Sequence, residues 1–196
     1  GAPKVLPSSN NAMSGGVPVA SYVDGSGTRV PRVSLTVVDT SSLIQIRQSG
    51  LSPAEQTKVF KTLTARARAG LLHFPPQVRD ELEWNEPDRP NDAAREWVRS
   101  VRAAAERAAD FETVKRVLAR APLLIDVNSK RDQADPYVIA LALDAQSLGG
   151  VSILSDDRRD RSDGRGGHQK LSVATVAGLW DIPVVPLAGF MLRNRR

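Results

Sequence analysis

The sequence predicts a three-layer α/β fold, with a mostly parallel central sheet of about five strands and helices on both faces. Apolar, β-branched runs alternate with helix-like stretches along the chain, and this order is typical of parallel sheets joined by right-handed crossovers. The length of 196 residues favours one domain, and the 41% hydrophobic and 25% charged residues suit an ordinary globular protein.

Residues 1–31 differ in composition from the rest of the chain. They are rich in Gly, Pro, Ser and Asn and carry few large apolar side chains, so they can bury too little surface to offset the entropy of ordering. We therefore expect a flexible, low-complexity tail over 1–31, followed by one domain over 32–196. The chain does not begin with Met, so part of this tail is a candidate for an artificial extension.

We expect five strands, each a short apolar run bounded by polar, Gly or Pro residues. They cover 32–39, 71–74, 123–127, 151–155 and 182–185. The first run, RVSLTVVD, lacks an apolar–polar alternation, which suits a central strand buried on both faces. A polar loop is expected over 156–170, because Asp, Arg and Gly dominate that stretch.

Between the strands we expect helices with recognisable start and stop signals. They cover 53–69, 75–84, 91–120, 135–148 and 173–180. Ser52 and Glu55 form a capping box ahead of the first helix, and Gly70 ends it. Asn91 is the expected cap of the 91–120 stretch, which should break near Asp110 into two helices.

The residue types that are missing exclude several kinds of chemistry. The chain has no Cys, which excludes disulfides, thiolate nucleophiles, iron–sulfur clusters and zinc fingers. Any metal ion must therefore bind through oxygen or His ligands. No run of about 18 apolar residues and no signal-peptide pattern occurs, so we expect a cytoplasmic protein that does not enter membranes. The net charge of +5 favours polyanionic partners such as nucleic acid.

An acidic residue stands at each of four strand-to-helix junctions. In chain order these residues are Asp39, Glu81, Asp135 and the pair Asp156 and Asp157. Because the carboxyl ends of parallel strands meet at one edge of a sheet, we expect these side chains to gather there. Carboxylates that are packed together are expected to hold either protons or a cation, and Mg²⁺ or Mn²⁺ is the obvious cation because it prefers oxygen ligands.

Each acid also has a plain structural explanation. Asp135 is a good helix N-cap, and Glu81 belongs to an acidic helix whose charged face is expected to be solvated. Asp39 can initiate a turn, and the acids after the fourth strand alternate with Arg in a loop. These explanations do not predict an acid at all four junctions.

Four segments, VVDTSSLI, PPQVRDEL, ADPYVIALAL and ILSDD, resemble in this order the four acidic motifs of a PIN domain. The likeness spans about 33–187. Within that superfamily the chain is most similar to PIN-like proteins of bacterial toxin–antitoxin type, including the lysine-bearing segment GHQKL before the last helix and strand.

The resemblance implies a metal-dependent endoribonuclease that cleaves single-stranded RNA, the toxin of a toxin–antitoxin pair. By family likeness we expect a cognate antitoxin protein and a homodimer. The catalytic, metal-binding acids are then Asp39, Glu81, Asp135 and Asp157, with Ser41, Ser155 and Asp156 in support. Asp157 fits the family pattern better than Asp156, although the doubled acid leaves the fourth ligand open. The 91–120 stretch is a helical insertion relative to minimal members, suited to a cap or a dimer contact.

Basic residues are needed to attract a polyanion to an acidic site. The candidates for substrate binding are Lys58, Lys61, Arg158 and Lys170. Each of them is also explained as part of a solvated surface. Aromatic residues make up only 5% of the chain, so we expect no dedicated platform for stacking bases.

The main competing function is a catalytically inactive PIN-fold module that binds nucleic acid or regulates a partner. Retention of all four acidic positions favours the enzyme, because a surface that only binds a polyanion has no use for a carboxylate cluster. A phosphatase of the haloacid dehalogenase type would need a second acid two residues after Asp39, where Ser41 stands.

Overall fold

The computed structural model describes residues 21–23, 29–31, 34–85, 92–126, 129, 131–147, 149–162 and 169–194. The chain divides into two compact units, Gly1–Arg32 and Val33–Arg196. In the first unit, β1 (Ser21–Val23) pairs in antiparallel fashion with β2 (Arg29–Pro31). Residues 1–20 and 24–28 of the expected tail lie outside the described residues.

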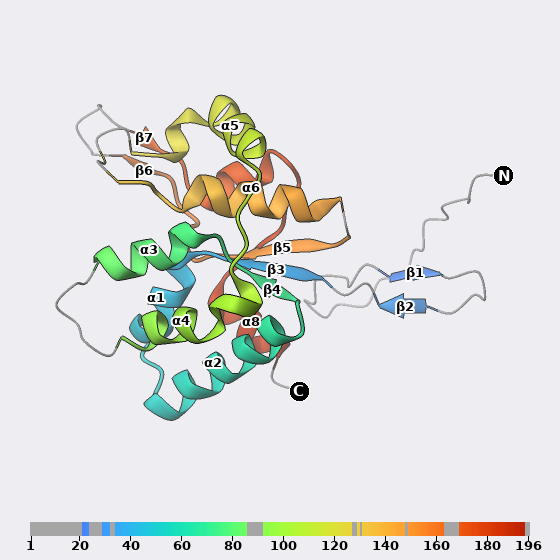
Figure 1. Ribbon diagram of the computed structural model, residues 1–196, viewed down its shortest axis with the longest axis vertical. Coiled ribbons are helices and arrows are strands. Elements are labelled where there is room, and N and C mark those ends of the chain that lie inside the picture. The colour runs from blue at the N-terminus through green and yellow to red at the C-terminus, as the bar shows by residue number, and fades with distance from the viewer. Residues whose placement is uncertain are drawn as a thin grey trace. The chain divides into compact units, whose positions relative to one another are not determined.

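A parallel sheet of four strands lies at the centre of the second unit and confirms the expected α/β fold (Figure 1). Across the sheet the strands are β4 (Leu72–His73), β3 (Leu35–Val38), β5 (Val151–Leu154) and β8 (Val184–Val185). The β3 strand pairs with both β4 and β5, and Val38 lies opposite Leu154. Both of these side chains are buried, as the absence of alternation predicts for central strands.

Helices cover both faces of this sheet (Figure 1). On one face α6 (Asp135–Gln146) packs on β3 and β5, with α5 (Phe111–Arg120) and α7 (Val173–Gly178) beside it. The helices that pack together on the other face are α1 (Thr40–Gln48), α2 (Pro53–Arg68), α4 (Ala93–Ala105) and α8 (Leu187–Arg193). The α3 helix (Pro76–Asn85) contacts α1 and α4. The second unit is therefore a three-layer structure.

The expected helix signals are largely confirmed. Ser52 caps α2 through the complete capping box with Glu55. Asp110 caps α5, so the 91–120 stretch breaks where expected. The cap of α4 is Asp92, whose carboxylate accepts hydrogen bonds from two backbone N–H groups of the first turn, and the expectation that Asn91 caps it was wrong by one residue.

The expected strand at 123–127 is wrong. Residues Pro122–Leu124 form a 3₁₀ turn, η1, and the described residues up to Asp126 add no strand. Leu123 is 45% exposed and only Leu124 of this turn is buried, so the apolar run lies outside the sheet. At the outer edge of β4 a single parallel bridge joins Phe74 to Glu106 instead.

The 91–120 stretch belongs to both helical layers rather than to an added cap. The α4 helix packs on α2 and α3, whereas α5 packs on α6 across the sheet. Between them the chain passes the sheet edge, where the Phe74 N–H donates to the carbonyl of Ala105 and the Arg107 N–H donates to the carbonyl of Phe74, each at 3.0 Å. The 91–120 stretch is therefore hydrogen-bonded to the edge of the sheet beside β4.

Two short elements lie inside the expected polar loop. These are β6 (Arg161–Ser162) and β7 (Gln169–Lys170), which pair in antiparallel fashion and form a ribbon. The helices α1 and α8 were also not expected. Among the helices of the described residues, none is long and apolar enough to span a membrane.

Candidate functional site

The candidate site lies where the strand order of the sheet reverses. The connection after β3 leads to β4 on one side, and the connection after β5 leads to β8 on the other. In open α/β sheets the carboxyl ends of the strands at such a switch point flank the usual ligand crevice. Asp39 directly follows β3, and Ser155 directly follows β5. The structure therefore brings the first and fourth predicted motifs together.

Asp39 is held in place by two serines. Its side chain is buried, with 1% exposure, and its backbone N–H donates to the carbonyl of Leu154 at 3.0 Å. One carboxylate oxygen, Oδ2, accepts hydrogen bonds from Ser41 Oγ at 2.5 Å and from Ser155 Oγ at 2.7 Å. Asp39 occupies the N-cap position of α1, but its side chain makes no capping hydrogen bond. A role in starting the turn therefore does not explain this carboxylate.

The two serines also bind the backbone on the other side of the site. Ser41 Oγ accepts from the N–H groups of Asp156 at 3.0 Å and Asp157 at 3.2 Å. Ser155 Oγ accepts from the same Asp157 N–H at 3.1 Å. Each hydroxyl therefore donates to Asp39 and accepts from the segment after β5, which fixes the distance between the two strand ends.

Glu81 and Asp135 meet at the start of α6. Glu81, from α3, accepts a hydrogen bond through Oε1 from the N–H of Ala134 at 2.8 Å. Ala134 is the N-cap residue of α6, and its side chain makes no capping hydrogen bond. Glu81 therefore serves as the hydrogen-bond acceptor for a backbone N–H group at this helix end. Asp135 is the first helical residue, and its Oδ2 lies 2.8 Å from Lys170 Nζ. The alternative explanation of Asp135 as the N-cap of α6 therefore does not hold, because Ala134 occupies that position.

Three of the predicted acids influence one another electrostatically. Burial, together with the charges of Asp135 and Glu81, raises the pKa of Asp39 to about 7, against the hydrogen bonds from the two serines, which lower it. Burial also raises the pKa of Glu81 and of Asp135, and Lys170 opposes both shifts. We call Asp39, Glu81 and Asp135 the acid cluster.

Asp156 and Asp157 both have structural partners. Asp156 Oδ2 accepts from Ser42 Oγ at 2.8 Å and from the N–H of Leu187 at 3.1 Å, which joins α1 to the start of α8. Asp157 accepts from the N–H of Val173 at 3.1 Å, at the start of α7. Its charge also raises the pKa of Asp135, so of the two acids Asp157 is the one that acts on the cluster.

The donor chemistry of the acid cluster fits a hard divalent cation. Buried carboxylates that repel one another are stabilised by such an ion, and Mg²⁺ commonly takes one or two carboxylates together with water and substrate phosphates. Within the part of the chain that the structure describes, no three His, Cys, Asp or Glu side chains form a ready group that could hold a metal ion. A bound ion would thus rely on few protein ligands, drawn from Asp39, Glu81 and Asp135.

A family model supports the extent of this domain. The model described as "Domain of unknown function (DUF4411)" matches residues 36–194. The chain belongs to the DUF4411 family. The match contains the four sheet strands almost completely, together with all four predicted acids. A comparison with curated proteins finds no match.

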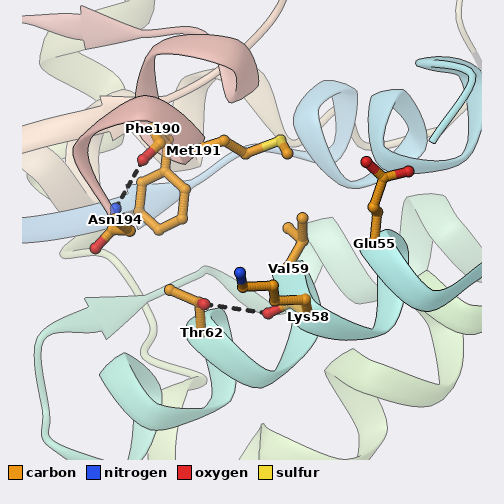
Figure 2. Close-up of a pocket in the computed structure, with 7 residues that line it drawn as sticks. All are labelled: Glu55, Lys58, Val59, Thr62, Phe190, Met191 and Asn194. Carbon is orange, nitrogen blue, oxygen red and sulfur yellow. Dashed lines mark hydrogen bonds between the residues drawn. The ribbon is translucent and has the colours of Figure 1, made fainter. Parts of the chain in front are cut away.

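The predicted basic residues of this DUF4411 chain fall in different places. Lys170 faces the acid cluster, and Arg158 is exposed directly after Asp157. Lys58 lines a hollow of about 320 Å³ between α2 and α8, across from Phe190 (Figure 2). Lys61 lines a more open hollow of about 540 Å³ between α2 and α4. None of the four acids is among the residues that line either hollow.

Two features beside the cluster were missed by the sequence analysis. Arg161 lies 3.3 Å from a carboxylate oxygen of Asp157, and the only signal for it was the spacing of four residues. Trp84 stands one turn after Glu81 on α3, is 40% exposed, and has the Arg131 guanidinium 5.5 Å from its ring centre. A low aromatic content does not reveal that one exposed ring stands one helical turn from Glu81.

Proposed function

We propose that this chain is a divalent-metal-dependent phosphodiesterase, an endoribonuclease that cleaves single-stranded RNA. The observation that carries the proposal is the acid cluster at the switch point of the sheet. Two buried carboxylates, Asp39 and Asp135, with the partly buried Glu81 beside them, cost free energy at neutral pH unless a cation offsets their charge. A chain that keeps such a cluster at the usual place for a ligand is best explained by a cation that binds there.

The chain's own residues would prepare this site. Mg²⁺ or Mn²⁺, when bound, supplies Lewis-acid activation of water and neutralises charge on the phosphodiester. Asp39 and Asp135 would hold the ion, with Glu81 beside them. The serine hydroxyls orient Asp39, and the N–H of Ala134 orients Glu81. Such chemistry does not use the ribose 2′-hydroxyl, so the cluster alone does not select RNA over DNA.

The substrate and biological setting are proposed from the PIN resemblance. The net charge of +5 and the exposed Arg158 suit a polyanionic substrate. The order of the four acidic segments supports a PIN-like toxin of a toxin–antitoxin pair, with a cognate antitoxin and a homodimer. A cytoplasmic location goes with this proposal.

One observation favours a second candidate, an inactive PIN-fold module that binds nucleic acid. Lys170 already neutralises Asp135 at 2.8 Å, and among the described acids no three are grouped closely enough to share an ion. In such a module Lys170 would take the place of a metal ion permanently.

Cleavage of a fluorescent single-stranded RNA by the full chain separates the two candidates. With Mg²⁺ or Mn²⁺ we expect cleavage that EDTA abolishes and that Asp39→Asn lowers about a hundredfold or more, because the variant loses one anionic ligand. Glu112→Gln, which removes an exposed carboxylate of α5, should leave the rate unchanged. Cleavage that persists in EDTA contradicts the proposal. RNA binding without cleavage supports the inactive module.

A further inference from the structure

The β6–β7 ribbon carries two cations onto the acidic site. Arg161 and Lys170 lie opposite each other in the ribbon, as register partners of its two strands. Lys170 Nζ is 2.8 Å from Asp135 Oδ2, and Arg161 Nη2 is 3.3 Å from Asp157 Oδ1. One small element therefore supplies positive charge to two of the four predicted acids.

The two ion pairs differ in strength. The Arg161 side chain is 70% exposed, so solvent and salt screen its attraction to Asp157. Lys170 is 27% exposed and its partner Asp135 is 11% exposed, so this pair is screened much less. The charge of Lys170 also lowers the pKa of Glu81. Lys170 therefore acts on two of the three members of the acid cluster.

We propose that Lys170 is the built-in counter-ion of the acid cluster, and that a divalent metal ion must displace its ammonium group from Asp135 in order to bind. This inference rests on the proposed metal site and adds a mode of regulation to it. Any contact that holds the Lys170 ammonium at Asp135 opposes metal loading, and any contact that draws it away favours metal loading.

The ribbon is built so that the ammonium group can move while the backbone stays in place. After β7, the N–H of Leu171 donates to the carbonyl of Leu123 at 2.8 Å, and the N–H of Ser172 donates to Asp160 Oδ1 at 2.8 Å. These bonds anchor the backbone next to Lys170. The ammonium is a compact charge on a flexible four-carbon stem, so it can leave Asp135 for solvent by rotation about side-chain bonds alone.

Electrostatic attraction decides how the divalent ion and the Lys170 ammonium compete for the carboxylates. A divalent ion offsets more of the charge of several carboxylates than one ammonium does, and two cations at the same carboxylates repel each other. Lys170 therefore weakens the apparent metal affinity without excluding the metal. Removal of the Lys170 charge should therefore raise the affinity of the cluster for a divalent ion. It should also leave the negative charge of the cluster more dependent on that ion for neutralisation.

The first test is the Mn²⁺ affinity of the full chain, measured by isothermal titration calorimetry. Lys170→Met should bind Mn²⁺ about tenfold more tightly than the wild type, because a competing unit charge is gone. Lys115→Met is the matched control, since Lys115 pairs with Glu112 on α5 and the variant loses the same charge. It should stay within about twofold of the wild type. Equal or weaker Mn²⁺ affinity of Lys170→Met overturns the inference, whatever the variant does to RNA binding.

The second test uses the wild-type chain, so it does not depend on the folding of a variant. Acetylation of Lys170 by an amine-reactive reagent, followed by mass spectrometry, should become severalfold faster when Mg²⁺ is added, because the displaced ammonium is exposed. Lys58 on α2 is the internal control and should react at the same rate with and without Mg²⁺. An unchanged rate at Lys170 under saturating Mg²⁺ overturns the inference.

The same titrations separate this inference from the proposed function. If Mn²⁺ binds to neither the wild type nor Lys170→Met, the proposed metal site itself fails. If Mn²⁺ binds both equally and Asp39→Asn abolishes binding, the metal site stands and only the counter-ion role of Lys170 fails.

Discussion

Asp39 is the residue whose ionisation responds most clearly to its surroundings. Its carboxylate is buried behind β3, and burial together with Asp135 raises its pKa to about 7. The folded chain therefore keeps a proton on Asp39 at pH values where the unfolded chain has lost it. Between the ordinary Asp pKa of 3.8 and the raised pKa of about 7, the folded state binds more protons than the unfolded state, so the stability contributed by this group falls as the pH rises.

We predict that Asp39→Asn removes part of this pH dependence. The quantity to compare is the difference in unfolding free energy between the wild type and the variant, both without metal. Between about pH 4 and pH 7 this difference should fall by about 1.4 kcal/mol per pH unit, and above pH 7 it should stay level. Urea unfolding in EDTA at several pH values measures both curves. Parallel curves would show that Asp39 does not carry a raised pKa.

Ser41 joins the two strand ends through a single hydroxyl group. Ser41→Ala removes one donor to Asp39 and leaves the N–H groups of Asp156 and Asp157 without this acceptor. We predict a loss of about 1–3 kcal/mol in unfolding free energy, as is usual when buried polar groups lose a partner. Ser152→Ala on β5 is the control and should change stability by less than about 0.5 kcal/mol. A loss for Ser41→Ala no larger than that of the control contradicts the network.

At the scale of elements, the aromatic residue Trp97 joins α4 to its neighbours. The Trp97 ring lies 6.0 Å from the rings of Phe60 and Phe74, measured between ring centres, and its indole N–H donates to Thr64 Oγ1 at 3.0 Å. It thus joins α4 to α2 and to the end of β4. The position of α4 in turn supports α3, which carries Glu81.

Truncation of this side chain should therefore be costly. We predict that Trp97→Ala lowers the unfolding free energy by about 3–5 kcal/mol, because it leaves a cavity between the helical layer and the sheet edge. Phe111→Ala is the comparison, because Phe111 is 66% exposed and its loss should cost less than about 1 kcal/mol. If the two substitutions cost the same, Trp97 does not anchor α4.

Elements with local start signals could be predicted from the sequence, whereas elements that depend on tertiary contacts could not. The capping box of Ser52 and Glu55 is a local pattern and gave the start of α2 correctly. The β6–β7 ribbon has strands of two residues each, too short to show any periodicity. The apolar run at 123–127 has the composition of a strand, but it begins as a 3₁₀ turn. The chain segment that pairs beside β4 is instead the one at Glu106, through its bridge to Phe74.

At the scale of the whole molecule, the strand order decides where the site lies. The alternation of strands and helices predicted that the ends of β3 and β5 would share one edge of the sheet, and there Asp39 Oδ2 accepts a hydrogen bond from Ser155 Oγ. The partner of Asp135 was beyond sequence reasoning, because the contact with Lys170 joins residues 35 positions apart through an irregular ribbon. The meeting of the two strand ends could therefore be predicted, but the ion pair between Asp135 and Lys170 could not.

The central claim is that the acid cluster binds a divalent cation, and a crystal structure of the chain grown with Mn²⁺ tests it most directly. We predict an anomalous difference peak in contact with carboxylate oxygens of Asp39 and Asp135, with Lys170 Nζ moved away from Asp135. A crystal with saturating Mn²⁺, no peak at these carboxylates and the Lys170–Asp135 ion pair intact would contradict the claim.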